Sequence, residues 1–147
     1  MKQFFILFIS GIIMLSTACV NETGNAVEGV WDLVYAERIA GDTLVWKFPG
    51  DYTGTDIKVW TKTHVIFVGR FKTDTTFVDN YGGGTYTLNG NRYEETILYH
   101  GATDLVGNTL KMLIEVRSDS IIQSWPVDDN WQVDKSNYQL EKYVRLE

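Results

Sequence analysis

The sequence predicts an all-β domain of eight to ten short antiparallel strands, arranged as a sandwich or a closed barrel. Segments rich in β-branched and aromatic residues follow one another along most of the chain, and turn residues separate them at regular intervals. No segment keeps an apolar period of 3.6 residues for longer than a turn or two. Closure into a barrel would also remove the sheet edges that invite aggregation.

Turn signals delimit the predicted strands. Pro49-Gly50 ends one strand, Asn89-Gly90-Asn91 suits the tight turn of a hairpin, and Ser118-Asp119 suits a second hairpin. Residues 82–84, three glycines, lead into a strand rather than a helix, which predicts a bulge or kink and not a phosphate loop. One helical turn is expected over 102–106. The strands are expected over residues 30–35, 44–48, 57–60, 65–71, 85–88, 92–99, 110–117, 120–125 and 138–146.

The N-terminus has the pattern of a secretory leader. A short charged start precedes an apolar run over 4–15, and small residues then lead to Cys19, the only cysteine in the chain. This pattern resembles the lipobox of bacterial lipoproteins, although Leu15 lies four places before the cysteine instead of the usual three. An ordinary signal peptide and an uncleaved anchor are the alternatives, but the run is shorter than the roughly 20 residues that span a bilayer.

The lipobox resemblance implies a domain organisation and an address. Residues 1–18 would be a cleaved signal peptide, and Cys19 would become the acylated, palmitate-carrying first residue. Residues 19–28 would form a flexible tether, and residues 29–147 the barrel domain. The expected location is the bacterial cell envelope, as a lipoprotein of the outer membrane that faces the periplasm or the surface.

Composition excludes several classes of function. The chain is acidic, with a formal net charge of −6, so it is not expected to bind nucleic acid, and it should meet the membrane only through its lipid. Two separated histidines and no second cysteine give no metal-ligand spacing, and no cofactor motif is present. We predict neither a metal nor a cofactor, while the oligomeric state is left open.

The choice of a barrel over a sandwich depends on the start of the domain. Gly29-Val30-Trp31 resembles the Gly-x-Trp signature of lipocalins and other calycins, in which the tryptophan plugs the closed end of an up-and-down barrel beneath a basic side chain of the last strand. Arg145 is the preferred partner in this sequence, and Lys142 is the alternative. The stretches 58–67, 82–95 and 141–145 extend the resemblance to lipocalin-like lipoproteins of Bacteroidetes-type bacteria, whose ligands are not settled.

Glu95 is the carboxylate that most needs an explanation. A period of two places it on one strand face with Tyr93, Ile97 and Tyr99. If this face points inward, Glu95 is buried and needs a partner or a polar ligand; if the faces are reversed, it lies in solvent. The sequence leaves both orientations open.

Three classes of function remain. The first is a binding module that holds a small, mainly apolar or aromatic molecule in the barrel. The second is a structural or interaction protein with a filled barrel that contacts an envelope partner or a glycan. The third, an enzyme with Glu95 and His64 as acid and base, is the least favoured, and we name no catalytic residue. Ligand-binding candidates are Lys58, Trp60, His64, Tyr86, Tyr93, Glu95, Tyr99 and Trp125.

Overall fold

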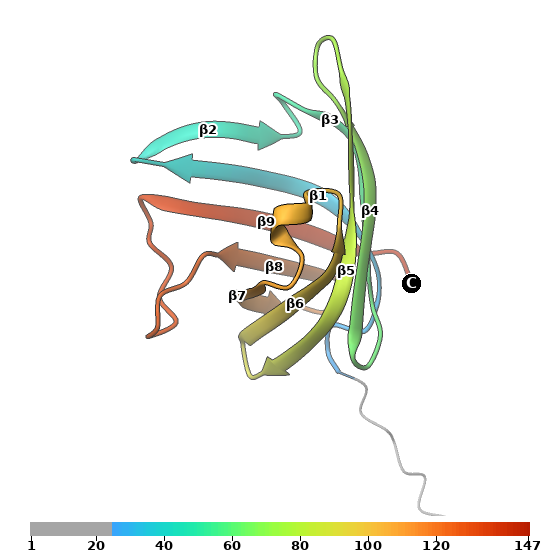
Figure 1. Ribbon diagram of the computed structural model, residues 1–147, viewed down its shortest axis with the longest axis vertical. Helices are drawn as coiled ribbons and strands as arrows, with labels where there is room; N and C mark the ends of the chain where they lie inside the picture. Colours follow the sequence, from blue (N-terminus) through green and yellow to red (C-terminus); the bar gives the residue numbers. More distant parts are fainter. Residues whose placement is uncertain (1–24) are drawn as a thin grey trace, which may run out of the picture.

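The structure is a closed antiparallel barrel of eight strands with one additional strand. It is a computed structural model that describes residues 25–147. The sheet order is β2-β1-β3-β4-β5-β6-β7-β8-β9, and pairing of β1 with β9 closes the barrel (Figure 1). The predicted all-β, up-and-down architecture is therefore confirmed. The predicted leader, Cys19 and the first part of the tether lie outside the described residues.

From β3 to β9 the strands follow one another around the barrel in chain order, and β1 pairs with both β3 and β9. They are β1 Gly29–Ala40, β2 Thr43–Phe48, β3 Thr53–Trp60, β4 His64–Lys72, β5 Phe77–Asn89, β6 Arg92–His100, β7 Thr109–Val116, β8 Ser120–Trp125 and β9 Asn137–Arg145. The predicted helical turn is the 3-10 helix η1, Thr103–Leu105. The main departures are longer β1 and β5, because residues 36–40 and 77–84 also pair as strand. No helix among the described residues is long and apolar enough to cross a membrane.

The additional strand arises because β1 is longer than its barrel neighbour. Gly29–Asp32 of β1 pair with β3, whereas Ala36–Ala40 pair with β2 on the same edge. The second half of β1 and β2 thus form a hairpin that turns away from β3 and β4 (Figure 1). Aromatic side chains of this region, among them Phe48 and Tyr52, face the interior of the barrel.

Trp31 lies at one end of the barrel, where the chain enters β1. It is fully buried, and its Nε1 donates to the backbone oxygen of Val27 at 2.8 Å. The register of β1 and β9 sets Trp31 opposite Arg145, whose guanidinium carbon lies 4.1 Å from the indole centroid. Glycine suits position 29 because its φ is +135° and because a Cβ atom there would meet the Arg145 guanidinium and lie 2.7 Å from the Glu147 backbone oxygen.

The first barrel strand begins at Gly29, as predicted, but the packed part of the chain starts a few residues earlier. Val27 is fully buried, and the Glu28 amide donates to the Asn25 backbone oxygen at 2.8 Å. Residues 25–28, which the sequence assigned to the tether, therefore belong to the packed domain. The physical reason is that Val27 is an apolar side chain beside Trp31, in a segment otherwise polar enough to resemble a linker.

A bulge between β5 and β6 reverses the alternation of side chains at the end of β6. Gly83 pairs with Tyr99 and Gly84 with Ile97, so Leu98 is the extra residue. Ile97 points inward, but Tyr99 is 74% exposed and His100 lines the interior instead. The glycine run predicted a bulge, but the strict period of two wrongly put Tyr99 on the face of Tyr93 and Glu95.

Candidate functional site

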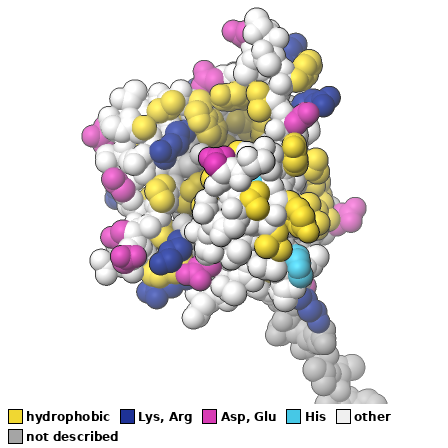
Figure 2. Space-filling model, in the orientation of Figure 1, with side chains coloured by type: hydrophobic (Ala, Val, Ile, Leu, Met, Phe, Trp, Pro, Cys, Tyr) yellow, Lys and Arg dark blue, Asp and Glu magenta, His cyan; other side chains and the backbone are white. Residues whose placement is uncertain are grey.

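The barrel contains a cavity of about 450 Å³. This volume lies within the range of small-molecule sites, roughly 300 to 1,000 Å³. Figure 2 shows hydrophobic side chains gathered around the hollowed part of this face of the molecule. The lining includes Leu33, Ala36, Trp46, Phe48, Tyr52, Asp56, Lys58, Phe67, Phe71, Asn80, Glu95, Ile97, His100, Leu110, Met112, Trp125, Gln139, Glu141 and Tyr143.

Strand alternation places the polar side chains of the cavity in layers. On β3, Asp56, Lys58 and Trp60 are buried, while Ile57 and Val59 between them are less so. On β9, Gln139, Glu141 and Tyr143 share the inward face, and the register with β8 sets Gln123 opposite Glu141. Polar groups from five strands, β3, β5, β6, β8 and β9, therefore meet inside an otherwise apolar barrel, Asn80 being the one from β5.

Lys58 and Glu95 form a buried ion pair at the end of the cavity next to Trp60. Lys58 Nζ lies 3.5 Å from Glu95 Oε2 and donates to Gln123 Oε1 at 3.1 Å. Each of the two charged residues is at most 5% exposed. The orientation that the sequence left open is thus resolved: Glu95 points inward, and the partner it requires is Lys58.

Aromatic residues lie between this ion pair and the end of the barrel that Trp31 fills. Trp60 Nε1 donates to the Tyr93 hydroxyl at 2.9 Å, and that hydroxyl donates to Glu95 Oε2 at 2.9 Å. Burial and the neighbouring Glu95 carboxylate raise the pKa of Tyr93, so the phenol keeps its proton and remains a donor. Tyr86 stacks on Tyr93 with ring centroids 5.3 Å apart. Trp60, Tyr86 and Tyr93 thus form a packed, hydrogen-bonded layer, the floor of the cavity on its Trp31 side.

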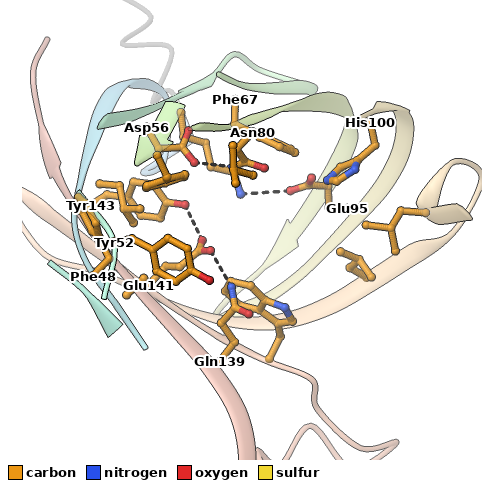
Figure 3. Close-up of a pocket in the computed structure, with 18 of the residues that line it drawn as sticks. Phe48, Tyr52, Asp56, Phe67, Asn80, Glu95, His100, Gln139, Glu141 and Tyr143 are labelled. Atoms are coloured by element: carbon orange, nitrogen blue, oxygen red, sulfur yellow. Dashed lines mark hydrogen bonds and ion pairs between the residues drawn. The ribbon is translucent and has the colours of Figure 1, made fainter. Parts of the chain in front are cut away.

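Asp56 carries a polar atom with no hydrogen-bond partner. The residue is 4% exposed, and its Oδ2 accepts a hydrogen bond from Asn80 Nδ2 at 2.6 Å (Figure 3). Its Oδ1 is buried and has no partner among the described residues. Burial raises the pKa of the Asp56 carboxyl from 3.8 to about 6, while the Asn80 hydrogen bond opposes the rise.

Glu141 is a third carboxylate in the cavity. Its oxygens accept hydrogen bonds from the Tyr143 hydroxyl at 2.5 Å and from Gln139 Nε2 at 3.1 Å (Figure 3). Burial raises the pKa of Glu141, and the Lys58 charge and these hydrogen bonds oppose the rise. Its hydrogen-bond donors are neutral groups, so they do not balance its charge.

The Asp56→Asn variant tests the burial of this carboxyl. Because the folded-state pKa, about 6, lies above the unfolded value of 3.8, the folded protein holds a proton that the unfolded chain has lost between these values. The stability of the wild type should therefore fall relative to Asp56→Asn as the pH rises from about 4 to about 6. Over this pH range the free energy of unfolding of the wild type should fall by about 3 kcal/mol relative to that of the variant.

Urea unfolding at several pH values measures this difference. Glu141 and Asp32 act on Asp56 to raise its pKa, and Lys58 acts to lower it, so all three stay unchanged in the comparison. The exposed Asp74→Asn is the matched control and should show little change with pH. A stability difference for Asp56→Asn that does not vary with pH would contradict the raised pKa.

The structure brings most of the predicted ligand-binding candidates together. Lys58, Glu95 and Trp125 line the cavity, and Trp60, Tyr86 and Tyr93 form the floor beneath it. His64 is exposed on β4, its Nδ1 is 2.8 Å from Thr63 Oγ1, and it does not line the cavity. Tyr99 also lies outside. Glu95 and His64 are therefore not placed as an acid and base pair.

Sequence reasoning missed several residues of the cavity. Asp56 is two places before Lys58, and Glu141 is two places before Tyr143, so the period of two was a usable signal for both. His100 could not be found in this way because the bulge reverses the alternation. The aromatic group of Trp46, Phe48, Tyr52 and Phe71 needed the hairpin of β1 and β2, which brings distant segments together.

Within residues 25–147, no group of three His, Cys, Asp or Glu side chains is placed to hold a metal ion. The three cavity carboxylates are accordingly separate hydrogen-bonding groups. No protein-family model matches the chain, and no curated protein matches it. The resemblance to lipocalins therefore stays a prediction.

Proposed function

We propose that this protein is a lipid-anchored envelope protein of the lipocalin-like type, whose barrel binds a small, mainly apolar or aromatic molecule. The observation that carries the proposal is the cavity of about 450 Å³ inside the barrel. Its lining combines aromatic and aliphatic side chains with a few polar groups. In such sites the apolar area supplies affinity and the polar groups fix the orientation of the ligand.

Titration with a hydrophobic fluorophore such as N-phenylnaphthylamine tests this proposal. Saturable binding is expected, and Ala36→Phe should weaken it because Ala36 is buried and lines the cavity. Ala26→Phe adds the same ring at an exposed position and should leave binding unchanged. Binding that the Ala36→Phe variant does not alter would place the probe outside the barrel.

The second candidate is a protein that contacts an envelope partner through its outer surface. The observation in its favour is the outer face of β4 to β6, where Ile66, Val68, Tyr81 and Tyr99 are each more than half exposed. Patches of exposed apolar side chains commonly mark interaction sites. Absence of any saturable small-molecule binding would favour this candidate over the cavity.

The proposed lipid anchor has its own test. Cys19→Ser should release the protein from membranes or leave it as an unprocessed precursor, because serine lacks the thiol that is acylated. Membrane fractionation and intact mass measure both outcomes. If the variant still fractionates with membranes, is cleaved normally and has no change in mass beyond the substitution, the protein is not a lipoprotein.

A further inference from the structure

The buried charges of the cavity do not balance. Among the described residues that line it, Asp56 and Glu95 are buried acids and Glu141 is a partly buried one, whereas Lys58 is the one buried base and His100 is a partly buried imidazole. Asp79 also reaches the lining, but it is exposed and paired with Arg70. The enclosed groups therefore carry an excess of negative charge when ionised, inside a low-dielectric interior where such an excess is costly.

Lys58 does not neutralise the whole group, because its contacts are already taken. Its Nζ pairs with Glu95 and donates to Gln123. The same atom lies 5.0, 5.6 and 5.9 Å from the ring centroids of Trp60, Phe67 and Tyr143. A carboxylate, an amide and three aromatic rings therefore hold the Lys58 ammonium group near the floor of the cavity.

Asp56 and Glu141 are the carboxylates that remain without a cationic partner in contact. Figure 3 shows them from β3 and β9 on the same side of the cavity, near Phe48 and Tyr52. The donors to them, Asn80, Gln139 and the Tyr143 hydroxyl, are neutral. Asp56 Oδ1 accepts no hydrogen bond from any residue that the structure describes, although it is buried and its residue lines the cavity.

We propose that the cavity selects organic cations: a protonated amine of the ligand donates to Asp56 Oδ1 near Glu141, and the apolar body packs among the neighbouring aromatic rings. This inference rests on the proposed binding function and adds the chemical class of the ligand. An ammonium group supplies both the missing donor and the missing positive charge. Phe48 and Phe71, with centroids 5.4 Å apart, and Tyr52 beside them provide the aromatic surface.

Three probes that share one ring system test the selectivity. Naphthylethylamine, naphthylethanol and naphthylacetate present a cation, a neutral group and an anion on nearly the same body. Isothermal titration at neutral pH should give an affinity for the amine on the order of tenfold higher than for the alcohol. The acetate should bind most weakly, because it meets like charge.

The Asp56→Asn variant tests whether Asp56 is the source of this preference. The variant should bring the affinity for the amine to within about threefold of the affinity for the alcohol. Asp74→Asn makes the same chemical change on an exposed turn and should keep the full preference. Unfolding midpoints of both variants establish that each is folded.

The outcomes separate the two proposals. Equal affinity for amine and alcohol, or tighter binding of the acetate, would overturn the cation selectivity and leave the binding cavity intact. An amine preference that persists in Asp56→Asn would also overturn the assignment to Asp56. Failure of all three probes to bind would contradict the proposed binding function itself, and the selectivity with it.

Discussion

Replacement of Trp31 with alanine is expected to lower the free energy of unfolding by about 3 to 5 kcal/mol, the usual loss for a large aromatic side chain removed from a core. Trp31 has no exposed surface, and its ring meets Trp60 edge-on at a centroid distance of 6.4 Å. Alanine would leave a cavity at this end of the barrel and remove the hydrogen bond to Val27. It would also leave Arg145 without the aromatic face that it covers.

Urea unfolding followed by circular dichroism measures this loss. Trp31→Phe keeps an aromatic ring but lacks the indole donor, so its loss should be clearly smaller than that of alanine. Trp131→Ala is the matched control, since Trp131 is only partly buried, in the segment between β8 and β9. Its effect should stay within about 1 kcal/mol. A change within about 0.5 kcal/mol for Trp31→Ala would show that the closed end does not depend on this plug.

The sequence predicts this end of the barrel well for a physical reason. Trp31 and Arg145 pair directly at the end of β1 and β9, before the register shift at Leu33/Tyr35, so their meeting follows once the barrel closes. Alternation along β3 and β6 likewise brings Lys58 and Glu95 inward together. Which of the two β6 faces is buried was not decided by the period alone, because both carry polar and apolar side chains.

The remainder of the site depends on departures from regular strands. The bulge at Leu98 moves Tyr99 outside and His100 inside, and a period of two cannot anticipate where an extra residue falls. Along one edge, the first part of β1 pairs with β3 and the last part pairs with β2. This pairing forms the hairpin that places Phe48 in the cavity. These features follow from tertiary packing, about which local sequence patterns carry little information.

Replacement of Lys58 with methionine is expected to destabilise the protein by about 3 to 5 kcal/mol, because it leaves the Glu95 carboxylate buried without its cation. Methionine retains much of the apolar stem, so lost packing is a small part of the effect. Gln123 would lose its donor to Oε1 at the same time. Urea unfolding at neutral pH measures the loss, with the exposed Lys72→Met as the matched control.

The double variant Lys58→Met with Glu95→Gln separates the charge from the packing. Glutamine can still accept the hydrogen bond from Tyr93, and it brings no buried charge, so most of the stability lost in Lys58→Met should return. A double-mutant cycle is expected to give a coupling of about 2 kcal/mol or more between the two positions. If Glu95→Gln fails to restore stability, the loss in Lys58→Met comes from packing or from Gln123. The ion pair would then not be what keeps Glu95 inside the barrel.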